Sequence, residues 1–208
     1  MHTRATWVQA PPDKVEQLTA NFKERVIPAA QQAKGFVGAA LLYNPDTQLA
    51  SGITIWESAR ALAESEQVGI ATRVQSASET AARIVNVERG EVVVMDRAAP
   101  PQSTGYCRSN FAYCEPEKVD ELIALIKDKA LPILRQQKGY RSTWMTVDRS
   151  TGQTTIMTVW DSAAEREASN AAIAPSREEA ARLMGSAVRV ELSEQLVAEV
   201  PSPAGLRV

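Results

Sequence analysis

Two copies of one pattern make up nearly the whole chain. Shifting the sequence by 104 positions places residues 4–95 over residues 108–199, without a gap as far as Arg73 over Arg177. A solenoid repeat spans roughly 20 to 50 residues, so each copy is expected to fold as a domain-sized unit. Identical pairs include Arg4/Arg108, Pro12/Pro116, Gly35/Gly139 and Trp56/Trp160.

Composition limits the class of protein. The 208 residues are 44% hydrophobic and 23% charged, as in an ordinary globular chain. Lys and Arg (23) are interleaved with Asp and Glu (25), so neither a nucleic-acid partner nor a membrane surface is expected. No apolar run follows Met1 as in a signal peptide, and none approaches the roughly 18 residues of a membrane span. A cytoplasmic protein is therefore expected.

Each copy is expected to fold as strand, helix, hairpin, helix and strand. Pro28 and Pro132 predict an interruption late in the first helices, and the second helices are expected to break near Gly69 and Pro175. The expected domain organisation is repeat one at 1–95, a linker at 96–105, repeat two at 106–200 and a tail at 201–208.

One βαββαβ unit leaves the second face of its sheet apolar and uncovered. Burial of apolar surface contributes roughly 25 cal/mol per Å², so two such sheets are expected to cover each other. The fold class predicted is α+β: two ferredoxin-like βαββαβ units packed sheet to sheet as an intrachain pseudo-dimeric α+β barrel. A further homodimer is left open.

Several local sequences repeat in both copies: a proline inside the first helix, a Lys-Gly-aromatic entry to the hairpin, and an aliphatic-Trp-acid-Ser ending. Together they resemble the antibiotic biosynthesis monooxygenase (ABM) domain family of the dimeric α+β barrel superfamily. The resemblance implies a ligand cleft in each unit between the sheet and its helices. The sequences that carry it are Lys34-Gly35-Phe36, Lys138-Gly139-Tyr140, Ile55-Trp56-Glu57-Ser58 and Val159-Trp160-Asp161-Ser162.

The sequence lacks the residues that several kinds of catalytic and cofactor site require. The sole histidine is His2, so no Ser-His-Asp or Cys-His nucleophile and no histidine metal cluster can be assembled. The haem-degrading branch of the family uses a histidine ligand that this chain lacks, although Asn110 stands where that branch has an asparagine. There is no Gly-rich dinucleotide or phosphate loop. We therefore expect no cofactor and no metal.

Aromatic and hydroxyl side chains recur at the end of each hairpin. Trp56 and Trp160 form either an aromatic wall against a flat substrate or a core plug at the sheet edge. Thr54 and Thr158 share their strand face and can point a hydroxyl into the same cleft, although a threonine in a strand needs no function.

Charged pairs also recur. The repeated arginines can anchor an anionic oxygen of a ligand or form surface pairs. The acids that follow the tryptophans can act as a general base or serve only the helix N-terminus. These residues are Arg4/Arg108, Arg73/Arg177 and Glu57/Asp161.

The copies differ along one face of their second strands. Copy one has Gly38 and Ala40 where copy two has Ser142 and Trp144. Because side chains two apart share a face, we hypothesise that Trp144 partly fills the cleft of copy two and that copy one keeps the roomier pocket.

The more polar set of side chains lies in copy two. Asn110, Tyr113 and Tyr140 stand there in place of Thr6, Gln9 and Phe36, which makes copy two the better candidate for catalysis. The catalytic candidates are Asn110, Tyr113, Tyr140 and Asp161, and the substrate-binding candidates are Thr54, Trp56, Gly38, Ala40, Trp144, Thr158 and Trp160.

Two functions fit these residues. The resemblance implies a cofactor-independent monooxygenase acting on a small aromatic or polyketide-like substrate, in which Asn110, Tyr113 or Trp160 donates hydrogen bonds and Asp161 or Tyr140 accepts a proton. The alternative is a non-catalytic barrel that binds a small hydrophobic molecule or is purely structural, because every candidate residue also has a packing explanation.

Overall fold

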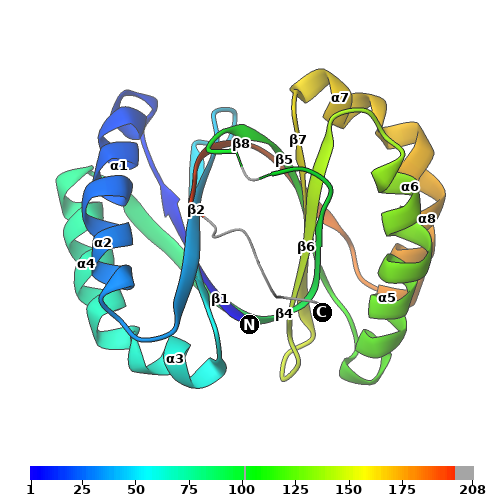
Figure 1. The fold of residues 1–208 in the computed structure, drawn as a ribbon, viewed down its shortest axis with the longest axis horizontal. Coiled ribbons are helices and arrows are strands. Elements are labelled where there is room, and N and C mark those ends of the chain that lie inside the picture. The colour runs from blue at the N-terminus through cyan, green and yellow to red at the C-terminus, as the bar shows by residue number, and fades with distance from the viewer. Residues whose placement is uncertain (101, 200–208) are drawn as a thin grey trace. The chain divides into compact units, whose positions relative to one another are not determined.

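The computed structural model describes residues 1–100 and 102–199; the predicted tail at 201–208 lies outside the described residues. The elements of copy one are β1 (His2–Gln9), a 3₁₀ turn (Pro12–Lys14), α1 (Val15–Asn21), a π-helical turn (Phe22–Val26), α2 (Ile27–Gln31), β2 (Phe36–Asn44), β3 (Leu49–Trp56), α3 (Ala59–Glu64), α4 (Glu66–Glu79) and β4 (Arg83–Arg97) (Figure 1). Those of copy two are β5 (Gly105–Tyr113), a 3₁₀ turn (Pro116–Lys118), α5 (Val119–Leu125), a π-helical turn (Ile126–Ala130), α6 (Leu131–Arg135), β6 (Tyr140–Asp148), β7 (Gln153–Trp160), α7 (Ala163–Ala168), α8 (Asn170–Met184) and β8 (Arg189–Glu199). The order of elements is the one predicted from the sequence.

The strands of the described residues pair in the order β1-β3-β2-β8-β5-β7-β6-β4 and close into a barrel. Both hairpins are antiparallel, with Tyr43 opposite Ala50 in one and Val147 opposite Thr154 in the other. The predicted α+β class, with two ferredoxin-like units forming a pseudo-dimeric barrel, is confirmed.

The described residues form two compact units whose limits differ from those of the sequence copies. The end of β4 pairs with β6, with Asp96 opposite Thr143, and the end of β8 pairs with β2, with Glu199 opposite Ala39. The predicted start of the linker at residue 96 therefore falls inside β4. Unit 1 comprises Met1–Arg89 with residues 102–104 and 193–199, and unit 2 comprises Gly90–Pro100 and Gly105–Leu192.

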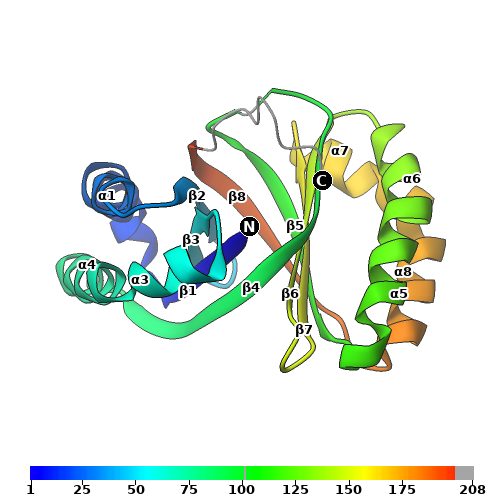
Figure 2. The same cartoon turned by 60° about the horizontal axis from the view of Figure 1, so that its bottom comes forward.

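Helices cover one face of the sheet in each unit. Figure 2 shows α1 and α4 side by side in unit 1, and α5, α6 and α8 side by side in unit 2. The first helix of each copy contains a π-helical turn just before Pro28 or Pro132. Because proline has no N–H to continue the helical ladder, the wider turn accommodates it. No helix of residues 1–100 and 102–199 is long and apolar enough to cross a membrane.

The second helices break earlier than predicted. The break falls at Ser65 and Ser169, whereas Gly69 lies inside α4 and Pro175 inside α8. Each serine hydroxyl donates to a carbonyl oxygen three residues back, over 2.7 Å. The side chain thus satisfies a helix-end carbonyl at the break.

Candidate functional site

Each unit contains a cavity between its sheet and its helices. The cavity of unit 2 has a volume of about 290 Å³, whereas that of unit 1 has about 80 Å³. The hypothesis that copy one keeps the roomier pocket is therefore wrong. Most of the unit 2 lining is apolar and includes Ile126, Leu134, Ile156, Ile173, Met184 and Val188.

The strands of unit 2 point polar side chains into the same cavity. Arg108 and Asn110 on β5 lie two residues apart and so share a face. Across the ladder, Arg108 pairs with Thr158 and Asn110 with Ile156 on β7, and all four residues line the cavity. The sheet therefore places an arginine, an amide and a hydroxyl at one apolar wall.

Arg108 and Arg177 supply the charge of this cavity. Arg108 is 3% exposed; its Nη1 donates to Ser169 Oγ over 3.1 Å, and its Nη2 donates to the carbonyl oxygen of Arg166. Arg177 donates to Asn170 Oδ1 and to the Asn170 carbonyl oxygen, both over 3.2 Å. Neither guanidinium forms an ion pair within residues 1–100 and 102–199.

Burial weakens the hold of Arg108 on its proton. Desolvation, together with the nearby charges of Arg177 and Arg166, lowers the pKa of Arg108 to about 10, although the charge of Glu167 partly offsets them. An anion beside Arg108 would reverse this shift. The cavity is therefore electrostatically suited to an anionic group.

Asn110 has an unsatisfied acceptor. Its Nδ2 donates to the Ile156 carbonyl oxygen over 3.3 Å, whereas its Oδ1 is buried with no hydrogen-bond partner among the described residues. An orphaned buried acceptor costs roughly 1–3 kcal/mol. A ligand O–H or N–H would satisfy Oδ1.

The tryptophans serve mainly as packing. Trp160 is 0% exposed, does not line the unit 2 cavity, and donates from Nε1 to Thr158 Oγ1 over 2.9 Å. Trp56 repeats the bond with Thr54 over 3.0 Å and lines the smaller cavity of unit 1. Each indole fixes the threonine that faces its cavity.

Tyr140 lies behind the cavity wall. Its hydroxyl donates to Asp96 Oδ2 over 2.8 Å and lies 2.7 Å from Oγ1 of Thr143, which lines the cavity. Burial, together with the Asp96 carboxylate, raises the pKa of Tyr140 well above its ordinary value. Tyr140 therefore keeps its proton, which argues against the predicted role as a base.

Two further catalytic candidates lie away from the cavity. Tyr113 is 60% exposed at the end of β5. Asp161 is exposed and forms an ion pair with Arg141. Neither residue lines the cavity of unit 2, so Asn110 is the one catalytic candidate that reaches it.

Three predicted substrate-binding residues face the wrong side of their strands. In β2 the cavity side carries Leu41, and Gly38 and Ala40 alternate with it. In β6 the cavity side carries Thr143, which places Trp144 on the opposite face. Gly38, Ala40 and Trp144 therefore do not line either cavity.

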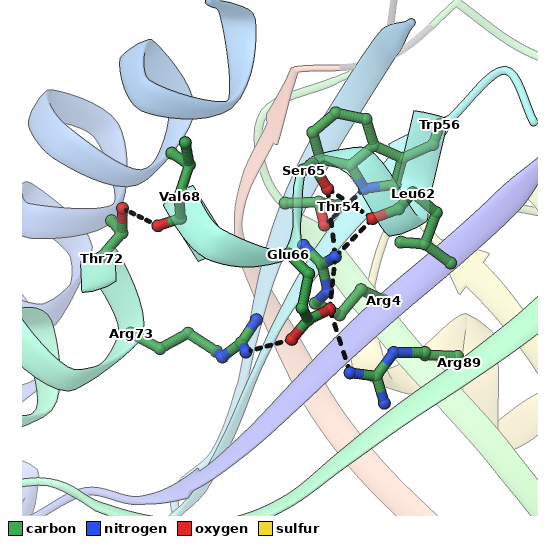
Figure 3. A network of polar contacts seen from close by, with 10 residues as sticks. All are labelled: Arg4, Thr54, Trp56, Leu62, Ser65, Glu66, Val68, Thr72, Arg73 and Arg89. Atoms are coloured by element: carbon green, nitrogen blue, oxygen red, sulfur yellow. Dashed lines mark hydrogen bonds and ion pairs between the residues drawn. The ribbon is translucent and has the colours of Figure 1, made fainter. Parts of the chain in front are cut away.

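In unit 1 the equivalent arginines bind a carboxylate of the same unit. Figure 3 shows Glu66 between three arginines: Arg4 Nη2 lies 2.8 Å from Glu66 Oε2, Arg73 Nη2 lies 2.8 Å from Oε1, and Arg89 Nη2 lies 3.0 Å from Oε2. Burial alone would raise the pKa of Glu66, but the bonds from Arg73 and Arg89 and the charge of Arg4 lower it to about 2. Sequence reasoning missed Glu66, whose only signal is that the second copy has Asn170 in its place.

No family model matches the chain. Two uncharacterized proteins of Mycobacterium tuberculosis are similar in sequence. Rv2557 is 27% identical over 184 residues, which cover 86% of this chain and 82% of the relative. Rv2558 is 24% identical over 148 residues, which cover 71% of this chain and 62% of the relative.

Solved structures similar in fold include ABM-like proteins. An anthrone oxidase-like protein matches with a TM-score of 0.71 and 14% identity, covering 100% of this chain and 95% of its own. A candidate monooxygenase from Fusobacterium nucleatum matches with a TM-score of 0.71 and 11% identity, covering 97% and 95%. A heme-degrading enzyme from Listeria monocytogenes matches with a TM-score of 0.53 and 12% identity, covering 93% and 98%. At these identities the likeness confirms the ABM-like fold predicted from the sequence.

Proposed function

We propose that the chain is a cofactor-independent monooxygenase that acts on a small aromatic or polyketide-like substrate in the cavity of unit 2. The observation that carries the proposal is the apolar cavity of about 290 Å³ with Arg108, Asn110 and Arg177 at its lining. An engineered apolar cavity of about 150 Å³ holds one benzene ring, so this volume suits about two fused rings. The name of the anthrone oxidase-like neighbour supports an aromatic substrate that is oxidised at a ring carbon.

In such a reaction the substrate itself reduces O₂. A phenolic or benzylic proton passes from the ring system to water, and the positive charges of Arg108 and Arg177 favour the resulting anion. The anion passes an electron to O₂ and the two radicals combine. One oxygen atom remains on the substrate as a ketone and the other leaves as water, so a ring CH₂ loses four electrons and O₂ gains four.

Asn110 is the residue proposed to orient the substrate. Its free Oδ1 accepts a hydrogen bond from a ring hydroxyl, which fixes the ring that has to lose its proton. Thr158 lies beside it on the same wall and is held by Trp160. Tyr140 and Asp161 are left with structural roles.

Oxygen uptake by purified, metal-free protein with 5-hydroxy-2-tetralone, a two-ring ketone with an activated ring CH₂ and a ring hydroxyl, tests the proposal. We expect uptake above the buffer rate, a fall of about tenfold or more in Asn110→Leu, and no change in Thr6→Leu, the matched change in the cavity of unit 1. Uptake that never exceeds the buffer rate across a panel of two-ring hydroxytetralones and hydroquinones would end the proposal.

A second function is binding without turnover. It is favoured by the cavity lining, because Arg108 and Arg177 hold anions but do not accept protons at neutral pH. Calorimetric binding of an aromatic ligand by protein that consumes no oxygen would support this function over the first.

A further inference from the structure

The two copies have a charged residue and a neutral residue at one equivalent position. Glu66 and Asn170 stand 104 residues apart and begin α4 and α8. In unit 1 the Glu66 carboxylate contacts Arg4, Arg73 and Arg89. In unit 2, within residues 1–100 and 102–199, the amide oxygen of Asn170 accepts from Arg177.

Among the described residues no carboxylate forms an ion pair with the cations of unit 2, and Glu167 acts on Arg108 only through its nearby charge. Arg108, Arg166 and Arg177 lie close enough for their charges to act on one another, and none of them forms an ion pair in the part of the chain that the structure describes. The Nε of Arg166 is buried without a hydrogen-bond partner there. The exposed Glu178 is the carboxylate in the cavity lining. Two cations in the lining of a largely apolar cavity, with the charge of Arg166 acting on one of them, attract an anion.

The packing beside the arginines also differs. A Cβ at Gly69 would lie 2.7 Å from Arg4 Nη1 and 3.0 Å from Arg73 Nη1, so the two guanidiniums of unit 1 crowd against this glycine. The equivalent residue of unit 2 is Ile173, which lines the larger cavity. Because Ile173 occupies the space that Gly69 leaves open, Arg108 and Arg177 cannot crowd together as Arg4 and Arg73 do.

We propose that the cavity of unit 2 binds an aromatic carboxylate, whose anionic group takes the position between Arg108 and Arg177 that Glu66 takes between Arg4 and Arg73. Unit 1 is then a copy closed by its own glutamate, and the chain binds one ligand. The proposal names the substrate class of the site described under the proposed function, and it also holds for binding without turnover. A ring hydroxyl that donates to Asn110 Oδ1 completes the ligand.

Isothermal titration with 6-hydroxy-2-naphthoate, whose hydroxyl lies on the ring opposite the carboxylate, tests the proposal, with 2-naphthol as the neutral analogue. We expect one site per chain and binding of the acid about tenfold or more tighter than that of the naphthol. Asn170→Glu should supply unit 2 with its own carboxylate and weaken the acid about tenfold or more while sparing 2-naphthol. Glu64→Gln, the control in unit 1, removes an exposed carboxylate that lines neither cavity and should bind the acid as the wild type does.

Arg177→Gln and its matched control Arg73→Gln give a second comparison should Asn170→Glu fail to fold. Loss of acid binding in the first and not in the second supports the proposal. Equal affinities for acid and naphthol, two acids bound per chain, or unchanged acid binding in Arg177→Gln would overturn it. Tight acid binding without oxygen uptake would refute only the oxygenase, whereas oxygen uptake without preference for the acid would refute only this inference.

Discussion

The hydroxyl of Tyr140 donates to Oδ2 of Asp96 over 2.8 Å and joins β6 to the end of β4. Arg135 donates to the other carboxylate oxygen of Asp96. Burial alone would raise the pKa of Asp96, but the bonds from Arg135 and Tyr140 hold it below its usual range. The tyrosine therefore stabilises a buried carboxylate behind the cavity wall.

Tyr140→Phe removes this bond and leaves the ring in place. Hydrogen bonds to charged groups contribute roughly 1.5–3 kcal/mol, so we expect the free energy of unfolding in urea to fall by about that amount. Packing should be preserved, because Phe36 is the equivalent residue of copy one and packs edge-on against Trp56 with ring centroids 5.6 Å apart, the same separation as between Tyr140 and Trp160. An unchanged midpoint and slope would contradict the stabilising role.

The pKa of Glu66 makes stability depend on acid pH. Its folded-state pKa is about 2 against an ordinary value of 4.5, so the unfolded chain binds more protons and stability rises with pH through this window. The contribution is complete above about pH 5 and is lost as pH falls toward 2. At 1.36 kcal/mol per pKa unit the effect is of order 3 kcal/mol at most.

Urea unfolding at several values between pH 3 and pH 7 measures this contribution. Glu66→Gln should lower stability at pH 7 and flatten the dependence below about pH 5. Glu64→Gln is the control, because Glu64 is exposed and forms a surface ion pair with Arg60 four residues earlier. Parallel curves for wild type and Glu66→Gln would show that the arginines do not stabilise the carboxylate.

Both cysteines should resist alkylation in the native protein. Cys107 is 0% exposed, and burial raises its pKa to about 12; Cys114 is 1% exposed, and burial raises its pKa as well. The reactive species is the thiolate, so iodoacetamide at pH 8 should label neither residue before unfolding and both in urea. Rapid native labelling detected by mass spectrometry would contradict the burial of these two thiols.

The repeat makes the fold predictable from the sequence. The sequence does not show which residues of β2 and β6 face the cavities, because both strands are buried on both faces. Copies related by 104 residues define the same elements twice, whatever their side chains do. β2 and β6 are buried on nearly every residue, so they lack the apolar-polar alternation that would separate the two faces. Ala40 and Leu41 are equally plausible cavity residues in such a strand.

The charged residues of the site are hard to predict from the sequence for a different reason. Arginines are rarely buried, so surface pairing was the simpler interpretation of Arg4 and Arg108, which are 4% and 3% exposed. Asp96 was assigned to a linker because the prolines after it suggest a chain boundary, but pairing with β6 extends β4 to Arg97. Tertiary contacts decide both cases, and one sequence does not contain them.

Ile173→Ala tests whether the cavity of unit 2 limits the size of its ligand. Ile173 is 5% exposed and lines the cavity. Its truncation should lower the free energy of unfolding by about 2–4 kcal/mol and allow a three-ring aromatic acid to bind where the wild type accepts two rings. Ile27→Ala is the matched control: Ile27 is 3% exposed and outside both cavities, so it should lose similar stability without a change in ligand size. If both variants change ligand preference alike, general loosening of the core explains the effect and the cavity does not set the ligand size.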